Sequence, residues 1–269
     1  MIITPKLGGW LADSKMPGAS AADDWKFADN KSTLMSAAVG VSNPGVEFDG
    51  ALALRKWCSP VEDQGHVGSC VGNSVVGALE FLQIRSGMQL SDLSRLFVYY
   101  NSRLMHQDQD KDTGTYIRLA FGTLSSLGTC TEKKWPYDVS KVFIRPGWGA
   151  YREGYANKIG SYYSIDTTGQ TRIDQVKEAL QTQHPVVFGM FVDNDYIKFN
   201  GSGVVPMPKK TRLGGGGHAQ LIVGYDDKIG AWLVRNSWGT GWGDGGYAWV
   251  PYDYVDVSDG NDFWVATAL

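Results

Sequence analysis

The amino-acid sequence predicts an α+β fold in which a helical N-terminal lobe is followed by a strand-rich C-terminal lobe. The prediction depends on a change in hydrophobic periodicity along the chain. Between about residues 65 and 145, apolar residues recur at helical spacing, whereas over residues 150–269 short apolar runs alternate with Gly or Asp. The expected strands are SYYSI, PVVFGMFV, AQLIVGYD, AWLVRNS, GYAWV and DFWVAT.

The first expected helix is amphipathic and begins at Cys70, directly after QGHVGS. Ser69 is placed to cap it and Gly87 to end it. At such a position the first-turn amides and the helix dipole favour a thiolate, which is the nucleophilic form of cysteine. A buried cysteine on a core helix is the other interpretation. The apolar positions of this helix are Val71, Val75, Ala78, Leu79 and Leu82.

Three more helices are expected. SDLSRLFVYYNSRLM has Ser91 as its cap, and TYIRLAFGTLSSLG is closed by Gly128. In the strand-rich half, one helix starts near Thr171, with Asp174 at capping-box spacing.

Residues 1–46 form an N-terminal arm that differs from residues 47–269, because it is rich in Ala and Gly and has little apolar pattern. Two interpretations of this arm stay open. It is a short gating or pro segment that restricts access to Cys70, or it is a strap that only adds stability. Its candidate anchors are Trp10, Leu11, Trp25 and Phe27.

The composition is that of a globular enzyme. Of 269 residues, 43% are hydrophobic and 20% are charged, and the longest apolar runs are far below the ~20 residues of a membrane span. A net charge of −3 argues against nucleic-acid binding. No secretory signal is apparent, so a cytoplasmic location is the default, with virion association or another export route as alternatives. Cys58 and Cys130 either form one disulfide or stay reduced.

Two later segments supply partners for Cys70. His218 follows four glycines and opens an apolar run, which puts it at the rim of a sheet. Asn236 ends a short strand in WLVRNSWGTGWGDGGY, beside Trp238. Cysteine, histidine and asparagine in this order provide a nucleophile, a base and a residue that orients the base.

With these segments, the chain resembles the papain-like (C1-type) cysteine peptidases, and most closely their bacterial, archaeal and viral branch without a long secretory propeptide. ALRKWCSPVEDQG, DTGTYIRLA and LGTCTEKKWPYD add to the resemblance. It implies a two-lobe fold with a helical N-terminal lobe, an antiparallel β-barrel-like C-terminal lobe and an active-site cleft between them. The separation of Cys70 and His218 fits the family, and Asn236 lies somewhat further along than expected.

The resemblance implies the roles of the catalytic residues. Cys70 matches the nucleophile, His218 the base, and Asn236 the residue that fixes the imidazole tautomer. Gln64 matches the side-chain donor of an oxyanion hole that is completed by the Cys70 amide.

The resemblance also implies a set of substrate-binding residues. Gly114 matches a segment that pairs with an extended peptide. Thr115 replaces a second glycine, which is expected to narrow the cleft. Trp238 matches the indole that covers the histidine–asparagine bond, and Gly217 and Ala219 are the small neighbours of His218. Two departures accompany these matches: Val67 replaces a structural cysteine and Val71 replaces an aromatic residue.

Other titratable residues are weaker candidates. His66 precedes the helix, His184 is a boundary residue before Pro185, and His106 lies in a polar run and is expected to be solvated. Asp108, Asp110 and Asp112 alternate like metal ligands but lack the Gly and Glu of a calcium loop, so no metal site is predicted.

The predicted function is hydrolysis of peptide bonds in peptide or protein substrates through a thioester acyl-enzyme, with no cofactor, nucleic acid or membrane involved. Two alternatives use the same fold. One is a virion or secreted structural component with little activity, and the other is an acyltransferase or isopeptidase. Side-chain preference and oligomeric state are left open.

Overall fold

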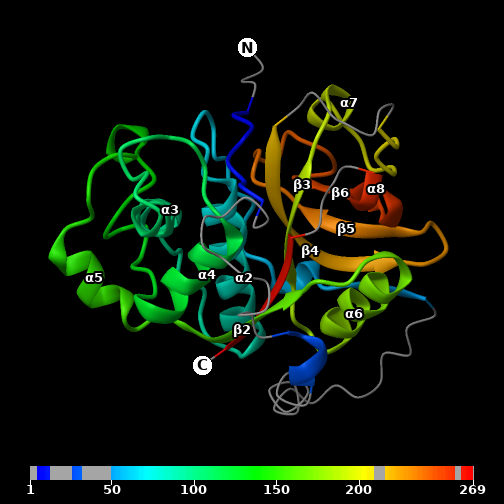
Figure 1. Ribbon diagram of the computed structural model, residues 1–269, viewed down its shortest axis with the longest axis horizontal. Helices are drawn as coiled ribbons and strands as arrows, with labels where there is room; N and C mark the ends of the chain where they lie inside the picture. Colours follow the sequence, from blue (N-terminus) through cyan, green and yellow to red (C-terminus); the bar gives the residue numbers. More distant parts are fainter. Residues whose placement is uncertain (1–4, 13–25, 32–49, 209–215, 258–261, 269) are drawn as a thin grey trace.

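The computed structural model describes residues 5–12, 26–31, 50–208, 216–257 and 262–268. Figure 1 shows helices α3, α4 and α5 on one side of the molecule and an antiparallel sheet with helices α6, α7 and α8 on the other. Helix α2 runs between the two parts. The order of a helical half followed by a strand-rich half is the one predicted from hydrophobic periodicity.

The helical half is built around α2 (Cys70–Arg85), which packs against α3 (Arg95–Met105), α4 (Ile117–Ser126) and strand β4. A short helix, α5 (Trp148–Gly154), follows. Nearly every residue of α2 is buried, so it is a central helix rather than the amphipathic one expected. The sheet covers one of its sides and the neighbouring helices cover the other, which explains the difference.

Helix ends agree with the sequence in part. Gly87 and Gly128 follow the ends of α2 and α4 with φ of 81° and 68°, as expected for glycines that stop helices. The cap of α3 is Ser94, whose side chain accepts from the Phe97 amide, so the expectation for Ser91 was wrong. Ser69 is the N-cap residue of α2, but its hydroxyl makes no capping bond and instead contacts the Tyr137 hydroxyl.

The sheet has seven strands in the order β2-β7-β3-β4-β5-β6, with β1 paired to β4, and each pairing is antiparallel. The C-terminal lobe is thus built on an antiparallel sheet, as expected. Over the described residues β2 and β6 are its two ends and do not pair, so the barrel-like sheet is not closed. The strands are β1 (Ala51–Ala53), β2 (Ile159–Ile165), β3 (Val186–Phe191), β4 (Gly217–Asp226), β5 (Ala231–Arg235), β6 (Tyr247–Pro251) and β7 (Asp262–Ala268).

Three helices accompany the sheet: α6 (Gly169–Gln181), α7 (Asn194–Ile197) and α8 (Tyr252–Val257). Helix α6 has Thr168 as its N-cap residue and begins before the expected Thr171, while Asp174 accepts from Gln170 instead of closing a capping box. Short 3₁₀ turns lie at Ala28–Asn30, Arg55–Trp57 and Val139–Lys141.

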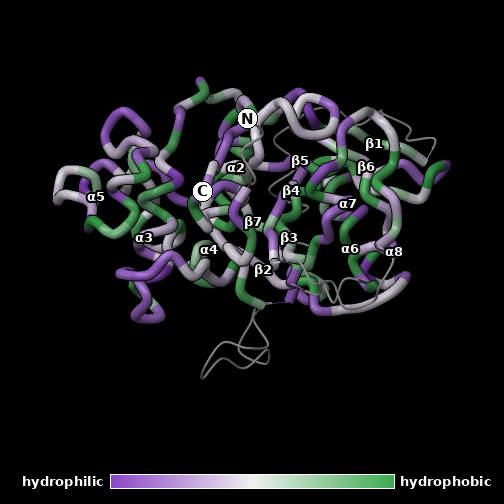
Figure 2. Tube along the Cα trace, turned by 90° about the horizontal axis from the view of Figure 1, so that it is seen from above, coloured by the Kyte–Doolittle hydropathy of each residue, from purple (hydrophilic) through white to green (hydrophobic). Residues whose placement is uncertain are grey.

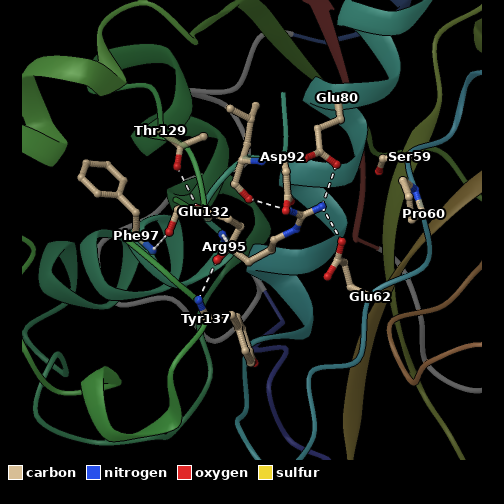
Figure 3. Close-up of polar contacts among 12 residues, drawn as sticks. Ser59, Pro60, Glu62, Glu80, Asp92, Arg95, Phe97, Thr129, Glu132 and Tyr137 are labelled. Carbon is tan, nitrogen blue, oxygen red and sulfur yellow. Dashed lines mark hydrogen bonds and ion pairs between the residues drawn. The ribbon is translucent and has the colours of Figure 1, made fainter. Parts of the chain in front are cut away.

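A buried ionic cluster ties α2 to α3. Arg95 is 1% exposed and contacts Glu80 at 2.7 Å, Glu62 at 2.9 Å and Asp92 at 2.5 Å. Figure 3 shows these carboxylates around the guanidinium, with Glu132 accepting from the Arg95 amide on the other side. Burial raises the pKa of Glu132 to about 7. Because Glu62 precedes the loop that carries Gln64, the cluster also ties this loop to the helices.

The N-terminal residues 5–12 lie between the two halves (Figure 1). In the view from above, α3 and α5 again lie on one side of the molecule and β6 and α8 on the other (Figure 2). Among the anchors expected in the arm, Trp10 and Phe27 are buried and Leu11 is partly buried, whereas Trp25 lies outside the described residues. All three cysteines are free thiols. Within the described part of the chain, no helix is long and apolar enough to cross a membrane.

Candidate active site

Cys70 is the first residue of α2 and lies against the start of β4. Its side chain is fully buried, and Sγ accepts a hydrogen bond from the Ala219 amide at 3.4 Å. His218 is the neighbour of Ala219 on the same strand. The fold therefore brings the predicted nucleophile and the predicted base to one place, although about half of the chain separates them.

His218 and Asn236 form a hydrogen bond of 2.8 Å between Nε2 and Oδ1. The same Oδ1 accepts from the Ser237 amide at 2.7 Å, which fixes the orientation of the carboxamide. Since this oxygen can only accept, Nε2 of His218 is the donor and the lone pair is on Nδ1. Nδ1 has no hydrogen-bond partner among the described residues.

The indole of Trp238 stacks on the His218 ring, with ring centroids 4.2 Å apart and an angle of 22° between the planes. Trp238 packs edge-on against Tyr196 and Trp242. Both His218 and Asn236 are almost fully buried. The aromatic cluster thus keeps water away from their hydrogen bond, as the resemblance implied.

Gln64 is buried, and Ser237 holds its carboxamide by donating to Oε1 at 2.7 Å. Its Nε2 donates to the carbonyl of Val67 at 3.0 Å and to that of Lys6 at 3.4 Å. The Gln64 side chain can therefore donate to a carbonyl oxygen, and here a carbonyl from the N-terminal arm is one of its acceptors.

Burial suppresses charge on both reactive groups. It raises the pKa of Cys70 to about 12, although the Ala219, Val71 and Cys70 amides act in the opposite direction. Burial also lowers the pKa of His218 to about 4, against the bond to Asn236. The thiolate expected from the helix terminus is thus not favoured in this state, because loss of solvation outweighs the amides. Thiol and imidazole are both neutral at pH 7.

Residues 8–11 of the arm pair with the edges that were predicted to bind substrate. The Gly8 amide donates to the Gly217 carbonyl at 2.9 Å. The Thr115 amide donates to Gly9, and the Leu11 amide donates to Thr115, both at 3.0 Å. Trp10 and Thr115 form a parallel bridge. The arm therefore occupies these main-chain groups.

Two glycines make this close approach feasible. A Cβ on Gly9 would lie 2.5 Å from the Gly68 carbonyl oxygen and 2.7 Å from Sγ of Cys70. Gly114 has a φ of 85°, and a Cβ there would lie 2.6 Å from the carbonyl oxygens of Gly8 and Gly9. No larger residue fits at either position while the arm is in place.

Trp10 anchors the arm beside the sheet. Its indole is 3% exposed, and Nε1 donates to Asp262 at 2.8 Å. The ring takes the space that a side chain at Gly189 would fill, because a Cβ there would lie 2.1 Å from it. Phe191 packs edge-on against the same ring.

Asp112 lies beside the loop that leads to Cys70, although the sequence reasoning considered it only as a possible metal ligand. Its carboxylate accepts from the Gly68 amide at 3.0 Å and the Tyr99 hydroxyl at 2.5 Å, and it pairs with Lys6 at 2.5 Å. Its position two residues before Gly114, a predicted substrate-binding residue, could have indicated that it lies near the cleft. The alternating aspartates drew attention to metal binding instead.

The weaker candidates lie away from this site or make other contacts. His66 is exposed, and burial beside Arg85 lowers the pKa of His184 to about 3, which agrees with a structural role. His106 is half-buried against Tyr116 and is not the solvated residue expected. Within the described ranges no cluster of acidic, histidine or cysteine side chains could hold a metal ion.

Comparisons with known proteins identify the family. Residues 47–260 match the papain family cysteine protease domain, Peptidase C1, so the chain belongs to the papain family and is a cysteine peptidase. Such enzymes act on peptides or proteins. An uncharacterized peptidase C1-like protein of Acanthamoeba polyphaga mimivirus is 36% identical over 231 residues, which cover 81% of this chain and 74% of that protein.

Animal relatives are longer than the matched region. A cathepsin L-like peptidase of Aedes aegypti is 32% identical over 70% of this chain, and the match covers 54% of the mosquito protein. Among solved structures, xylellain, a cysteine protease from Xylella fastidiosa, superposes with a TM-score of 0.76 at 30% identity, covering 98% of this chain and 97% of xylellain. These comparisons give no support to the structural-component or acyltransferase alternatives.

Proposed function

We propose that the chain hydrolyses peptide bonds through Cys70, His218 and Asn236, and that the N-terminal arm covers this triad in the resting state. The observation that carries the proposal is the hydrogen bond from His218 to Asn236, because it leaves Nδ1 of His218 free to accept the proton of the Cys70 thiol. The thiol of Cys70 accepts from the residue next to His218, which supports the pairing.

In the proposed reaction, Nδ1 of His218 takes the thiol proton while Sγ attacks the carbonyl carbon of the substrate. Gln64 Nε2 and the Cys70 amide donate to the oxyanion that develops. The tetrahedral intermediate collapses to a thioester when His218 protonates the departing amine. Water, deprotonated by His218, then hydrolyses the thioester and returns the thiol.

The arm inhibits this reaction in two ways. Its main chain occupies Gly217, Thr115 and Gln64, which are the groups that an extended substrate needs. Its packing also excludes water from Cys70 and His218, and both groups stay neutral as a result. Displacement of residues 5–12 both frees the cleft and restores solvation. Residues 1–46 are thus a gating segment ahead of the peptidase domain, residues 47–269.

Replacement of the nucleophile tests the proposal. Cys70→Ala is expected to abolish turnover of fluorogenic peptide amides and labelling by thiol-reactive peptide analogues, because no other thiol lies at the base. The matched control is Cys58→Ser, which removes a half-buried thiol elsewhere and is expected to keep both. Turnover that persists in Cys70→Ala would show that the assignment is wrong.

A further inference from the structure

Lys6 is held at the site by both its main chain and its side chain. Its carbonyl accepts from Gln64 Nε2 at 3.4 Å, and its amide donates to the Gly65 carbonyl at 3.3 Å. Its ammonium contacts the Asp112 carboxylate at 2.5 Å and donates to the Asp112 carbonyl at 2.7 Å. One residue thus places its carbonyl at the proposed oxyanion donor and its charged end on an acidic residue.

Asp112 is well placed to receive a cation. Its side chain is 16% exposed, and the Gly68 amide and the Tyr99 hydroxyl hold its carboxylate in a fixed orientation. The Tyr99 hydroxyl in turn accepts from the Gly114 amide at 3.1 Å. The nearby Arg103 donates to the carbonyls of Lys111 and Val142, so Lys6 is the cation bonded to Asp112 among the described residues.

We propose that Asp112 forms an acidic subsite which selects substrates with Lys or Arg at the residue whose carbonyl is attacked, and that Lys6 of the arm occupies this subsite at rest. The inference builds on the proposed function, since it names the substrate class of the same site. Lys6 shows that a residue whose carbonyl lies at Gln64 can reach Asp112 with a side chain of lysine length. A substrate residue in the same position could make the same contact. A neutral side chain there leaves the carboxylate without its cation.

The test compares fluorogenic peptide amides that differ only at this residue, which is Lys, Arg, norleucine or Gln. The full-length protein is used together with its Gly9→Val variant, in which the new side chain collides with Gly68 and Cys70 and displaces the arm. Because a charge-assisted hydrogen bond is about twice as strong as a neutral one, kcat/KM for Lys or Arg is expected to exceed that for norleucine about tenfold or more.

Three further variants in the Gly9→Val protein identify the group responsible. Asp112→Asn is expected to bring the Lys-to-norleucine ratio close to one. Tyr99→Phe removes a hydrogen bond to the same carboxylate but keeps its charge, so the preference should survive. Asp110→Asn removes an exposed charge from the same loop and should leave the ratio unchanged.

The possible outcomes separate this inference from the proposed function. Equal kcat/KM for Lys and norleucine, or a preference that persists in Asp112→Asn, would overturn the acidic subsite and leave the peptidase intact. Loss of the preference in Asp110→Asn as well would also overturn it, because the effect would then not be specific to the charge at Asp112. Absence of turnover with every peptide would overturn the proposed function itself.

Discussion

At the scale of single residues, the site is organised by side chains that fix other side chains. Ser237 contributes twice: its amide orients Asn236, and its hydroxyl orients Gln64. A main-chain amide can only donate, so the orientation of Asn236 is unambiguous, and it determines which nitrogen of His218 carries the proton. Asn236 and Ser237, the two residues directly after β5, therefore determine which nitrogen of His218 is free to accept a proton and how the Gln64 carboxamide is oriented.

Gln64 is the residue whose loss should most directly report on oxyanion stabilisation. Gln64→Ala is expected to lower kcat about 10²–10³-fold with little change in KM, because its donor acts mainly on charge that develops in the transition state. Steady-state kinetics on a peptide amide measure this. Ser237→Ala, which only loosens the orientation of Gln64, should cost less than about tenfold, as expected for one neutral hydrogen bond. A normal kcat in Gln64→Ala would exclude it from the oxyanion hole.

At the scale of elements, the arm and the cleft approach each other closely because both have glycines where they meet. Gly9 faces Gly68 and Cys70, and Gly114 and Gly217 face the arm. The arm is held by main-chain hydrogen bonds, by the Trp10 anchor and by the Lys6–Asp112 pair. These three kinds of contact are expected to keep the arm in the cleft until another molecule or a substitution displaces it.

Gly9→Val is expected to open the site in the full-length protein. Overpacking at such a close contact costs about 1–3 kcal/mol, which corresponds to about a 5- to 150-fold rise in the population with a displaced arm. Turnover of a peptide amide should rise accordingly. Gly147→Ala is the matched control, since a Cβ there meets nothing within 4 Å and its φ of −69° suits alanine. Unchanged turnover in Gly9→Val would favour the interpretation of the arm as a stabilising strap.

The pH dependence of thiol reactivity should change with the arm. In the wild-type protein the Cys70 pKa of about 12 means that the thiol is protonated across the neutral range, so alkylation by iodoacetamide should be slow and still rising at pH 9. In Gly9→Val, restored solvation lowers this pKa, so alkylation should be faster at pH 7 and level off earlier. Mass spectrometry of the Cys70 peptide follows the reaction. Identical profiles for the two proteins would contradict burial by the arm as the cause.

At the scale of the whole molecule, sequence periodicity identified the longer helices α2, α3, α4 and α6 and the strands β2 to β7, because each carries a local pattern of apolar residues. It missed β1, α5, α7 and α8, which are short. The catalytic roles of Cys70, His218 and Asn236 came from the resemblance and stay predictions, and the fold brings the three residues together. The path of the arm was not predictable, since Trp10 looks like a generic anchor until Gly189 and Asp262 are beside it. The pKa of Cys70 was misjudged for a related reason: burial by a distant segment has no local signature.

Helices α2 and α3 are also joined by charge that the sequence did not reveal. Glu80 of α2 is fully buried, with Arg95 of α3 as its cation and the Leu93 amide as a donor. Burial raises the pKa of Glu80, which the Arg95 charge opposes. Arg95→Met should therefore lower the free energy of unfolding by about 3–5 kcal/mol, because it leaves a buried carboxylate without its cation. Chemical denaturation monitored by tryptophan fluorescence measures this.

A double-mutant cycle separates the ion pair from the packing around it. If the cost of Arg95→Met comes from the stranded carboxylate, then adding Glu80→Leu should recover part of it, and the double variant should lose less than the sum of the two single variants. Asp92→Asn serves as the control, since this partner of Arg95 is 68% exposed and such pairs contribute at most about 1 kcal/mol. Strictly additive losses would mean that Arg95 stabilises the interface between α2 and α3 by packing alone, and that the ionic cluster in Figure 3 contributes no coupling.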